Sequence, residues 1–143
     1  PFRGNNDIRH SFTWSHSYKW KSFQFSLGWK YRSGIPFTNA LGTIGEGDDI
    51  RINYDRINAS VLSDYHRLDF SALYEFKLSK KSDFSIGKLG FSLLNLYDRK
   101  NILSKDFGLF GSTDNNDNQT IELRGITKYS LGITPNLVFR VSF

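Results

Sequence analysis

The last sixteen residues of the chain, Lys128–Phe143, alternate between apolar and polar side chains. From position 129 on, the odd-numbered residues are apolar or aromatic, and the even-numbered ones are polar or small except Val138. A two-residue period places these sets on opposite faces of a β-strand. Strands of soluble proteins usually have about 5–6 residues, whereas a tilted strand that crosses a bilayer needs roughly 9–11 residues plus its interfacial ends. The length of the alternation therefore favours a membrane-spanning strand at residues 127–143.

The same period predicts four further strands, at residues 8–20, 22–32, 65–78 and 84–97. The apolar parity changes at Lys19–Lys21, which predicts a tight reversal between the first two strands. Ser79–Asp83 predicts a second short turn. Residues 33–64 and 98–126 lack sustained alternation and predict two long loops, the first with a short ribbon at Ile50–Tyr54.

The order of short turns and long loops predicts an all-β fold of antiparallel transmembrane β-barrel strands. Bacterial outer-membrane barrels have short periplasmic turns and longer extracellular loops. A spanning sheet must close, because lipid cannot satisfy an open strand edge, and bacterial barrels have eight strands or more. We therefore expect residues 1–143 to be the last five strands of a larger barrel. The chain begins at Pro1 with neither an initiator Met nor a signal segment, which agrees with a piece of a longer protein.

Composition leaves a second fold open. The chain has 143 residues, is 38% apolar and 16% aromatic, and has no cysteine. Its mean hydropathy is −0.44, which is compatible with a barrel strand because only every second residue faces lipid. The aromatic content suits the interfacial belts of a barrel, and also a soluble β-sandwich that binds carbohydrate. The net charge of +5 is spread along the chain without a basic stripe, so we expect no nucleic-acid partner.

Candidate chemistry is sparse. Asp114, Asn116 and Asn118 match the opening of a calcium loop, but Gln119 replaces the required glycine, which favours a solvated polar loop. The three histidines lie too far apart in sequence to indicate a metal site; they are His10, His16 and His66. We find no nucleophile or paired-carboxylate signature and expect no enzyme activity, cofactor or metal.

Two groups of residues are the candidate functional positions. The apolar residues of the terminal strand are expected to form a barrel-assembly signal: Tyr129, Leu131, Ile133, Leu137, Phe139, Val141 and Phe143. Polar residues of the opposite parity are expected to face the lumen: Arg67, Asp69, Glu75, Lys77, Lys128, Asn136 and Arg140.

Four segments and the terminal strand resemble the C-terminal barrel of TonB-dependent outer-membrane receptors, of the type common in Bacteroidetes. The segments are Ser33–Thr38 (SGIPFT), Ile52–Asn58 (INYDRIN), Asp64–Phe70 (DYHRLDF) and Asn95–Asn101 (NLYDRKN). They occur in this order at predicted strand ends and cover most of the chain from His10 onward.

The resemblance implies a 22-stranded barrel with an N-terminal plug domain, which takes up a nutrient such as an iron chelate, vitamin, glycan or peptide with energy from the TonB complex. The implied partners are outer-membrane lipid, the rest of the barrel with its plug, the TonB complex through the plug, and the barrel-assembly machinery. The chain contains no plug, and no substrate residue carries over. The alternatives are a passive porin-like barrel and the soluble carbohydrate-binding sandwich.

Overall fold

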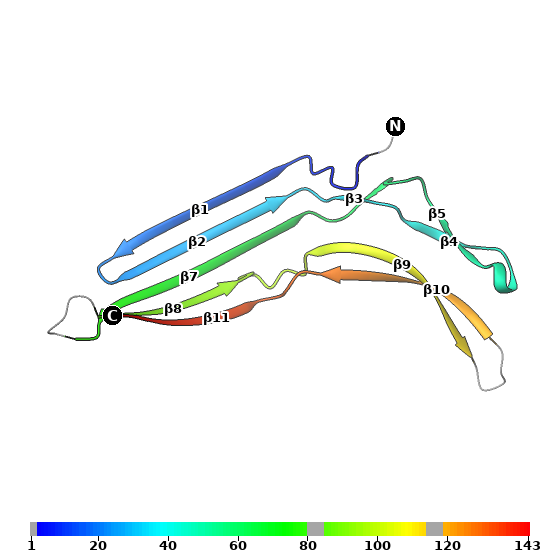
Figure 1. The fold of residues 1–143 in the computed structure, drawn as a ribbon. Helices are drawn as coiled ribbons and strands as arrows, with labels where there is room; N and C mark the ends of the chain where they lie inside the picture. Colours follow the sequence, from blue (N-terminus) through cyan, green and yellow to red (C-terminus); the bar gives the residue numbers. More distant parts are fainter. Residues whose placement is uncertain (1–2, 80–84, 114–118) are drawn as a thin grey trace. The chain divides into compact units, whose positions relative to one another are not determined.

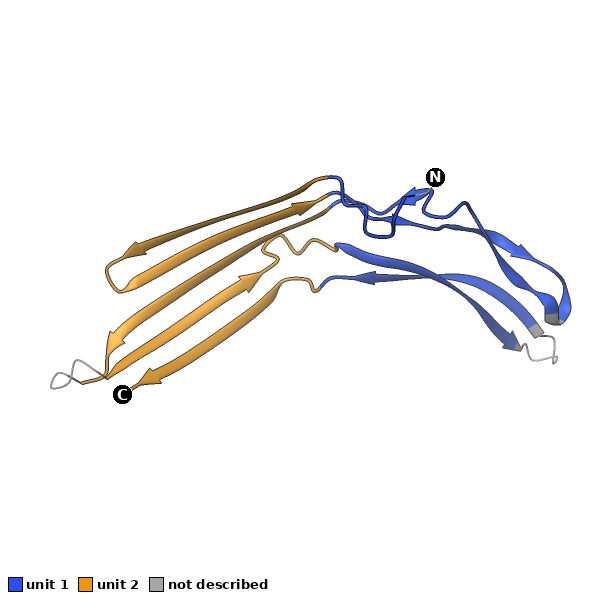
Figure 2. Ribbon diagram, turned by 45° about the horizontal axis from the view of Figure 1, so that its top comes forward, with its two compact units in different colours: residues 1–9, 33–64, 101–130 blue, residues 10–32, 65–100, 131–143 orange. Residues whose placement is uncertain are grey.

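The computed structural model describes residues 3–79, 85–113 and 119–143, and these residues form antiparallel β-strands (Figure 1). The predicted all-β, antiparallel class is confirmed. The chain divides into two compact units (Figure 2). Unit 1 comprises residues 1–9, 33–64 and 101–130, and unit 2 comprises residues 10–32, 65–100 and 131–143.

Unit 2 is one five-stranded sheet in the order β1-β2-β7-β8-β11, and every neighbouring pair is antiparallel. Its strands are β1 (Ser11–Trp20), β2 (Phe23–Arg32), β7 (Tyr65–Lys77), β8 (Ile86–Leu94) and β11 (Thr134–Ser142). The first four agree with the predicted strands to within three residues at each end. The predicted reversal joins β1 to β2 and places Lys21 in the left-handed region, at φ 52°. The turn predicted at residues 79–83 lies, apart from Ser79, outside the described residues.

Unit 1 consists of short ribbons and one longer hairpin. Its elements are β3 (Pro36–Phe37), β4 (Ala40–Ile44), the 3-10 helix η1 (Gly47–Asp49), β5 (Arg51–Tyr54), β6 (Ser60–Val61), β9 (Ile102–Thr113) and β10 (Gln119–Tyr129). β3 pairs with β6, β4 with β5, and β9 with β10. The ribbon predicted at Ile50–Tyr54 is confirmed as β5.

The prediction that residues 98–126 form an irregular loop is wrong, because they include β9 and most of β10. The apolar residues of β9 occur as neighbours, Ile102 beside Leu103 and Leu109 beside Phe110. Apolar side chains therefore lie on both faces of the hairpin, which hides the two-residue period.

The terminal strand is shorter than predicted. Residues 127–129 belong to β10, and a turn separates them from β11, which begins at Thr134. Within this turn the N–H of Ile133 donates to Asp98 Oδ1 at 2.8 Å, so it is not available to a neighbouring strand. Pro135 is the second residue of β11, an outer strand of the sheet, where a missing N–H is tolerated.

Apolar burial is slight throughout the described residues. Leu62 of unit 1, 7% exposed, is the one buried hydrophobic side chain among them. In unit 2, side chains pack within one layer, as at Gly87, where the Phe76 ring occupies the space that a Cβ would fill. The side chains on both faces of the unit 2 sheet are therefore largely accessible to solvent.

Candidate functional site

The apolar face of the unit 2 sheet is continuous across all five strands. The strand register places apolar side chains directly opposite one another along a row formed by Tyr18, Phe25, Ala72, Phe91 and Leu137. Neighbouring rows are two residues away on every strand and are mostly apolar, because side chains on one face repeat at two-residue intervals. The alternation predicted for separate strands therefore combines into one surface.

This apolar face is exposed. The exposed fraction is 52% for Phe12, 72% for Leu137 and 62% for Phe139. Strands lie ~4.8 Å apart and rise ~3.3 Å per residue, so five strands of about nine residues cover on the order of 700 Å². The largest apolar patch of a typical monomeric protein is about 300–600 Å², and larger ones mark protein or membrane contacts. The size of the apolar face therefore indicates that it contacts an apolar partner, either protein or lipid.

Aromatic rings concentrate at both ends of the apolar face. Near the β1–β2 turn, Phe23 stacks on Trp20 and Tyr74 with ring centroids 6.3 and 4.7 Å apart. At the opposite end, Phe12 packs against Trp29 at 5.7 Å. The distance from Phe12 to Trp20, eight positions further along the strand, is ~26 Å, similar to the ~25 Å apolar band between aromatic girdles of transmembrane barrels.

One polar residue interrupts the apolar face near its middle. His16 lies opposite Leu27 and stacks on Trp14, with ring centroids 6.1 Å apart and planes 6° from parallel. The other two histidines are separate from it: His10 precedes β1, and His66 packs edge-on against Tyr97. Among the described residues, no three His, Asp or Glu side chains gather as metal ligands. The Asp114–Asn118 candidate falls outside the described residues.

The opposite face of the sheet is polar and carries two ion pairs. Arg67 Nη2 lies 2.7 Å from Asp69 Oδ2, and Lys88 Nζ lies 2.8 Å from Glu75 Oε2. Six of the seven predicted polar positions lie on this face: Arg67, Asp69, Glu75, Lys77, Asn136 and Arg140. Lys128 does not, because it belongs to β10, where it pairs with Asp106 at 3.3 Å.

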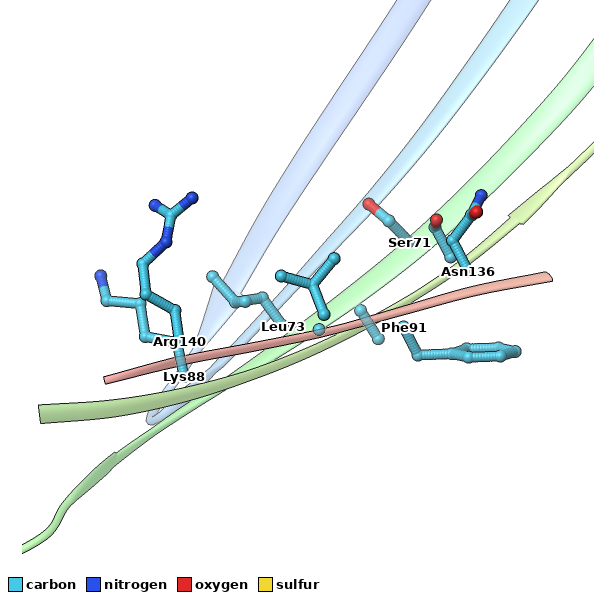
Figure 3. A pocket seen from close by; sticks show the side chains of 10 residues that line it. Ser71, Leu73, Lys88, Phe91, Asn136 and Arg140 are labelled. Carbon is cyan, nitrogen blue, oxygen red and sulfur yellow. The ribbon is translucent and has the colours of Figure 1, made fainter. Parts of the chain in front are cut away.

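A shallow pocket of about 380 Å³ lies on the sheet between β7, β8 and β11 (Figure 3). Leu73 and Val138 flank Gly90, whose missing side chain leaves the space. The labelled Arg140 and Lys88 project on the same side of the sheet as Leu73, whereas Phe91 projects on the other (Figure 3). The pocket thus combines a small apolar floor with a cationic edge.

A hydrogen-bonded turn after β8 fixes the far end of the sheet. Asn95 is 1% exposed and has a left-handed backbone, at φ 55°. Its Nδ2 donates to the carbonyl oxygens of Arg99 at 2.9 Å and Leu131 at 3.0 Å, and its Oδ1 accepts from Arg99 N at 3.2 Å. Its own N–H donates to Asp69 Oδ1 at 2.9 Å. Asn95 thus links the polar face of β7 through its backbone N–H, and the turn and the segment before β11 through its side chain.

Asp98 provides a second link to that segment. It also has a left-handed backbone, at φ 53°, and its Oδ1 accepts from Ile133 N at 2.8 Å. A Cβ at Gly132 would lie 2.5 Å from the same oxygen, so a larger residue would displace the Asp98 carboxylate from its bond to Ile133. We call Asn95, Asp98 and their partners Leu131 to Ile133 the C-terminal clasp.

The predicted assembly residues fall into two sets. Leu137, Phe139 and Val141 share the apolar face of β11, and Phe143 follows that strand. Tyr129 ends β10, whereas Leu131 and Ile133 belong to the clasp turn. Sequence reasoning did not assign roles to Asn95 and Asp98. A usable signal was present, since Asn and Asp are the non-glycine residues that most readily adopt φ > 0.

Comparison with models of protein families, with curated proteins and with solved structures finds no match. Among the described residues, no helix has both the length and the apolar character needed to cross a bilayer.

Proposed function

We propose that the unit 2 sheet is a section of the wall of an outer-membrane β-barrel, and that the whole protein is a TonB-dependent receptor that takes up a nutrient. In this proposal the apolar face contacts lipid, and the polar face contacts water or a plug domain. The observation that carries the proposal is the apolar face itself, which stays in register across five strands and is exposed.

Lipid is a better occupant of this face than a second protein layer. In a β-sandwich the inner faces interdigitate and become buried, whereas Leu137 and Phe139 are 72% and 62% exposed. The aromatic belts at the two ends of the face also favour lipid, since Trp and Tyr gather at membrane interfaces. These features favour a barrel over the soluble carbohydrate-binding sandwich.

Closure requires further strands. β1 and β11 are the outer strands of the unit 2 sheet, and an unpaired strand edge is too costly in hydrocarbon. We therefore propose that both edges pair with strands of the same barrel outside these 143 residues. The resemblance to TonB-dependent receptors supports 22 strands and energised uptake, in preference to a passive porin.

Site-directed spin labelling tests the assignment of the two faces. These 143 residues contain no cysteine. Single cysteines are therefore placed one at a time at residues 68–74 of β7 and labelled in the full-length protein in lipid, after any cysteine outside these residues has been replaced by serine. We expect collisions with oxygen to dominate at the even positions and collisions with a water-soluble nickel reagent at the odd ones. A uniform profile, or purification of the protein as a water-soluble monomer, would refute the membrane assignment.

Nutrient uptake by cells tests the class of barrel. If the protein is a TonB-dependent receptor, uptake requires the TonB complex and a proton gradient. Uptake that is proportional to external concentration and continues after the gradient is dissipated would instead indicate a passive porin.

A further inference from the structure

Unit 1 contains an open cavity of about 390 Å³ that is lined by three separate segments of the chain. Phe37 and Tyr54 come from the ribbons after β2, Lys105 comes from β9, and Asn5 comes from the N-terminal segment. Ligand pockets usually measure about 300–1,000 Å³ and combine apolar walls with a few polar groups. This cavity has the size and the mixed lining of such a pocket.

The one full positive charge in the lining is Lys105. Its Nζ lies 5.7 Å from the ring centroid of Phe37 and 5.4 Å from that of Phe107, so the ammonium is close to two aromatic rings. Tyr54 packs edge-on against Phe107 at 6.5 Å, which adds a third ring to this aromatic cluster. A partly desolvated cation of this kind attracts anions more strongly than one surrounded by water.

The neighbouring carboxylate does not neutralise this charge. Asp106 follows Lys105 in β9 and is the one carboxylate residue among the described residues that line the cavity. Its side chain pairs with Lys128 at 3.3 Å and accepts a hydrogen bond from Ser104 at 3.3 Å. No acidic side chain of the described residues forms an ion pair with Lys105. The carboxylate of Asp106 thus already has partners, whereas the ammonium of Lys105 has no carboxylate partner among the described residues.

Hydrogen-bond donors are also left over at the cavity. Asn58 Nδ2 donates to Arg3 O at 2.6 Å and to Asn5 Oδ1 at 2.8 Å. Because the Asn5 side chain accepts this bond through its oxygen, its NH₂ group can donate to another acceptor. Thr38 Oγ1 accepts from Asn58 N at 3.0 Å, which leaves its hydroxyl proton to be donated. The polar part of the cavity therefore offers donors to an acceptor-rich ligand.

We propose that this cavity binds an organic carboxylate, with the carboxylate at Lys105 and the apolar part of the molecule against Phe37 and Tyr54. The proposal rests on the proposed function, because it assigns the chemical class of the nutrient, or of one part of it, that the receptor recognises. A neutral ligand of the same shape forms the ring contacts but leaves the ammonium of Lys105 without a counter-charge.

Phenylacetate and phenylacetamide are matched probes, because they share a ring and a shape and differ in charge. Their dissociation constants are measured by saturation-transfer NMR with the detergent-solubilised full-length protein. We expect phenylacetate to bind about fivefold or more tightly, the effect of one partly screened charge pair. Lys105→Met keeps the apolar stem between the rings and should abolish the preference, whereas Lys105→Arg should retain it. Lys100→Met, at an exposed lysine outside the cavity, is the control for the loss of one charge and should behave like the wild type.

Equal binding of the two probes, absence of binding by both, or an unchanged preference in Lys105→Met would each overturn the carboxylate proposal. The spin-label profile of β7 does not depend on Lys105, so the two proposals fail independently. If the spin-label profile of β7 alternates but phenylacetate and phenylacetamide bind equally, only the carboxylate proposal is wrong. If the protein prefers phenylacetate to phenylacetamide but is a water-soluble monomer, only the membrane assignment is wrong.

Discussion

The C-terminal clasp makes a quantitative prediction about Asn95. Asn95→Ala removes three hydrogen bonds, two to Arg99 and one to Leu131. Each bond contributes about 0.5–1.5 kcal/mol net. Alanine must also adopt φ 55°, and the left-handed conformation costs an L-residue other than Asn, Asp or Gly roughly 1–2 kcal/mol. We expect the free energy of unfolding to fall by about 3–5 kcal/mol, a large change for a single substitution.

The side-chain and backbone contributions can be separated. Asn95→Gly also loses the three hydrogen bonds but adopts φ > 0 without strain, so it should be about 1 kcal/mol less destabilising than Asn95→Ala. Asn136→Ala is the matched control, because Asn136 is exposed on β11 and its truncation should change stability by less than about 0.5 kcal/mol.

The measurement is the guanidinium unfolding curve of the refolded full-length barrel in detergent, followed by tryptophan fluorescence. Heat-modifiable migration in gel electrophoresis confirms that each variant is folded at the start. If Asn95→Ala unfolds at the same denaturant concentration as Asn136→Ala, the clasp does not stabilise the fold and the reasoning is wrong.

Three further predictions concern single positions in unit 2. Leu137→Arg, on the apolar face, should reduce the stability of the barrel in lipid by about 2–4 kcal/mol, whereas Asn136→Arg on the polar face should have little effect; equal effects would contradict the assignment of the faces. Gly132→Ala forces a Cβ against Asp98 and should lower the unfolding midpoint by the equivalent of about 1–3 kcal/mol; an unchanged midpoint would show that the turn relaxes freely. Lys21→Gly removes the backbone strain of a lysine with positive φ and should raise the free energy of unfolding by up to about 1 kcal/mol, measured by the same denaturant curve. A decrease would mean that the loss of the Lys21 contact with the Trp20 ring outweighs the removal of strain.

The sequence predicted a strand correctly where apolar and polar residues alternate along its whole length. In β1, β2 and β7 the even–odd pattern identified the strand, its approximate ends and the face of each side chain. It failed at residues 130–133, where the pattern continues through Leu131 and Ile133 although the chain turns. Periodicity describes the environment of side chains and contains no information about which backbone N–H pairs with Asp98.

The sequence likewise predicted only part of the candidate site, namely the residues whose face follows from their position in a strand. The polar face followed from parity alone, so Arg67 and Asp69 were placed together before their ion pair was known. Lys128 was misplaced because parity cannot reveal that its strand ends one residue later, at Tyr129. The Lys105 cavity was not predictable, since it depends on three segments that are distant in the sequence.

The shared register of the unit 2 sheet limits how the length of its strands can change. Loss of one residue within β7 turns every later side chain of that strand to the opposite face, so Glu75 and Lys77 exchange environments with Tyr74 and Phe76. Loss of two residues shortens the strand by ~6.6 Å but leaves each remaining side chain on its original face. Insertions and deletions inside these strands should therefore be tolerated in pairs, and odd changes should be confined to the connections between them.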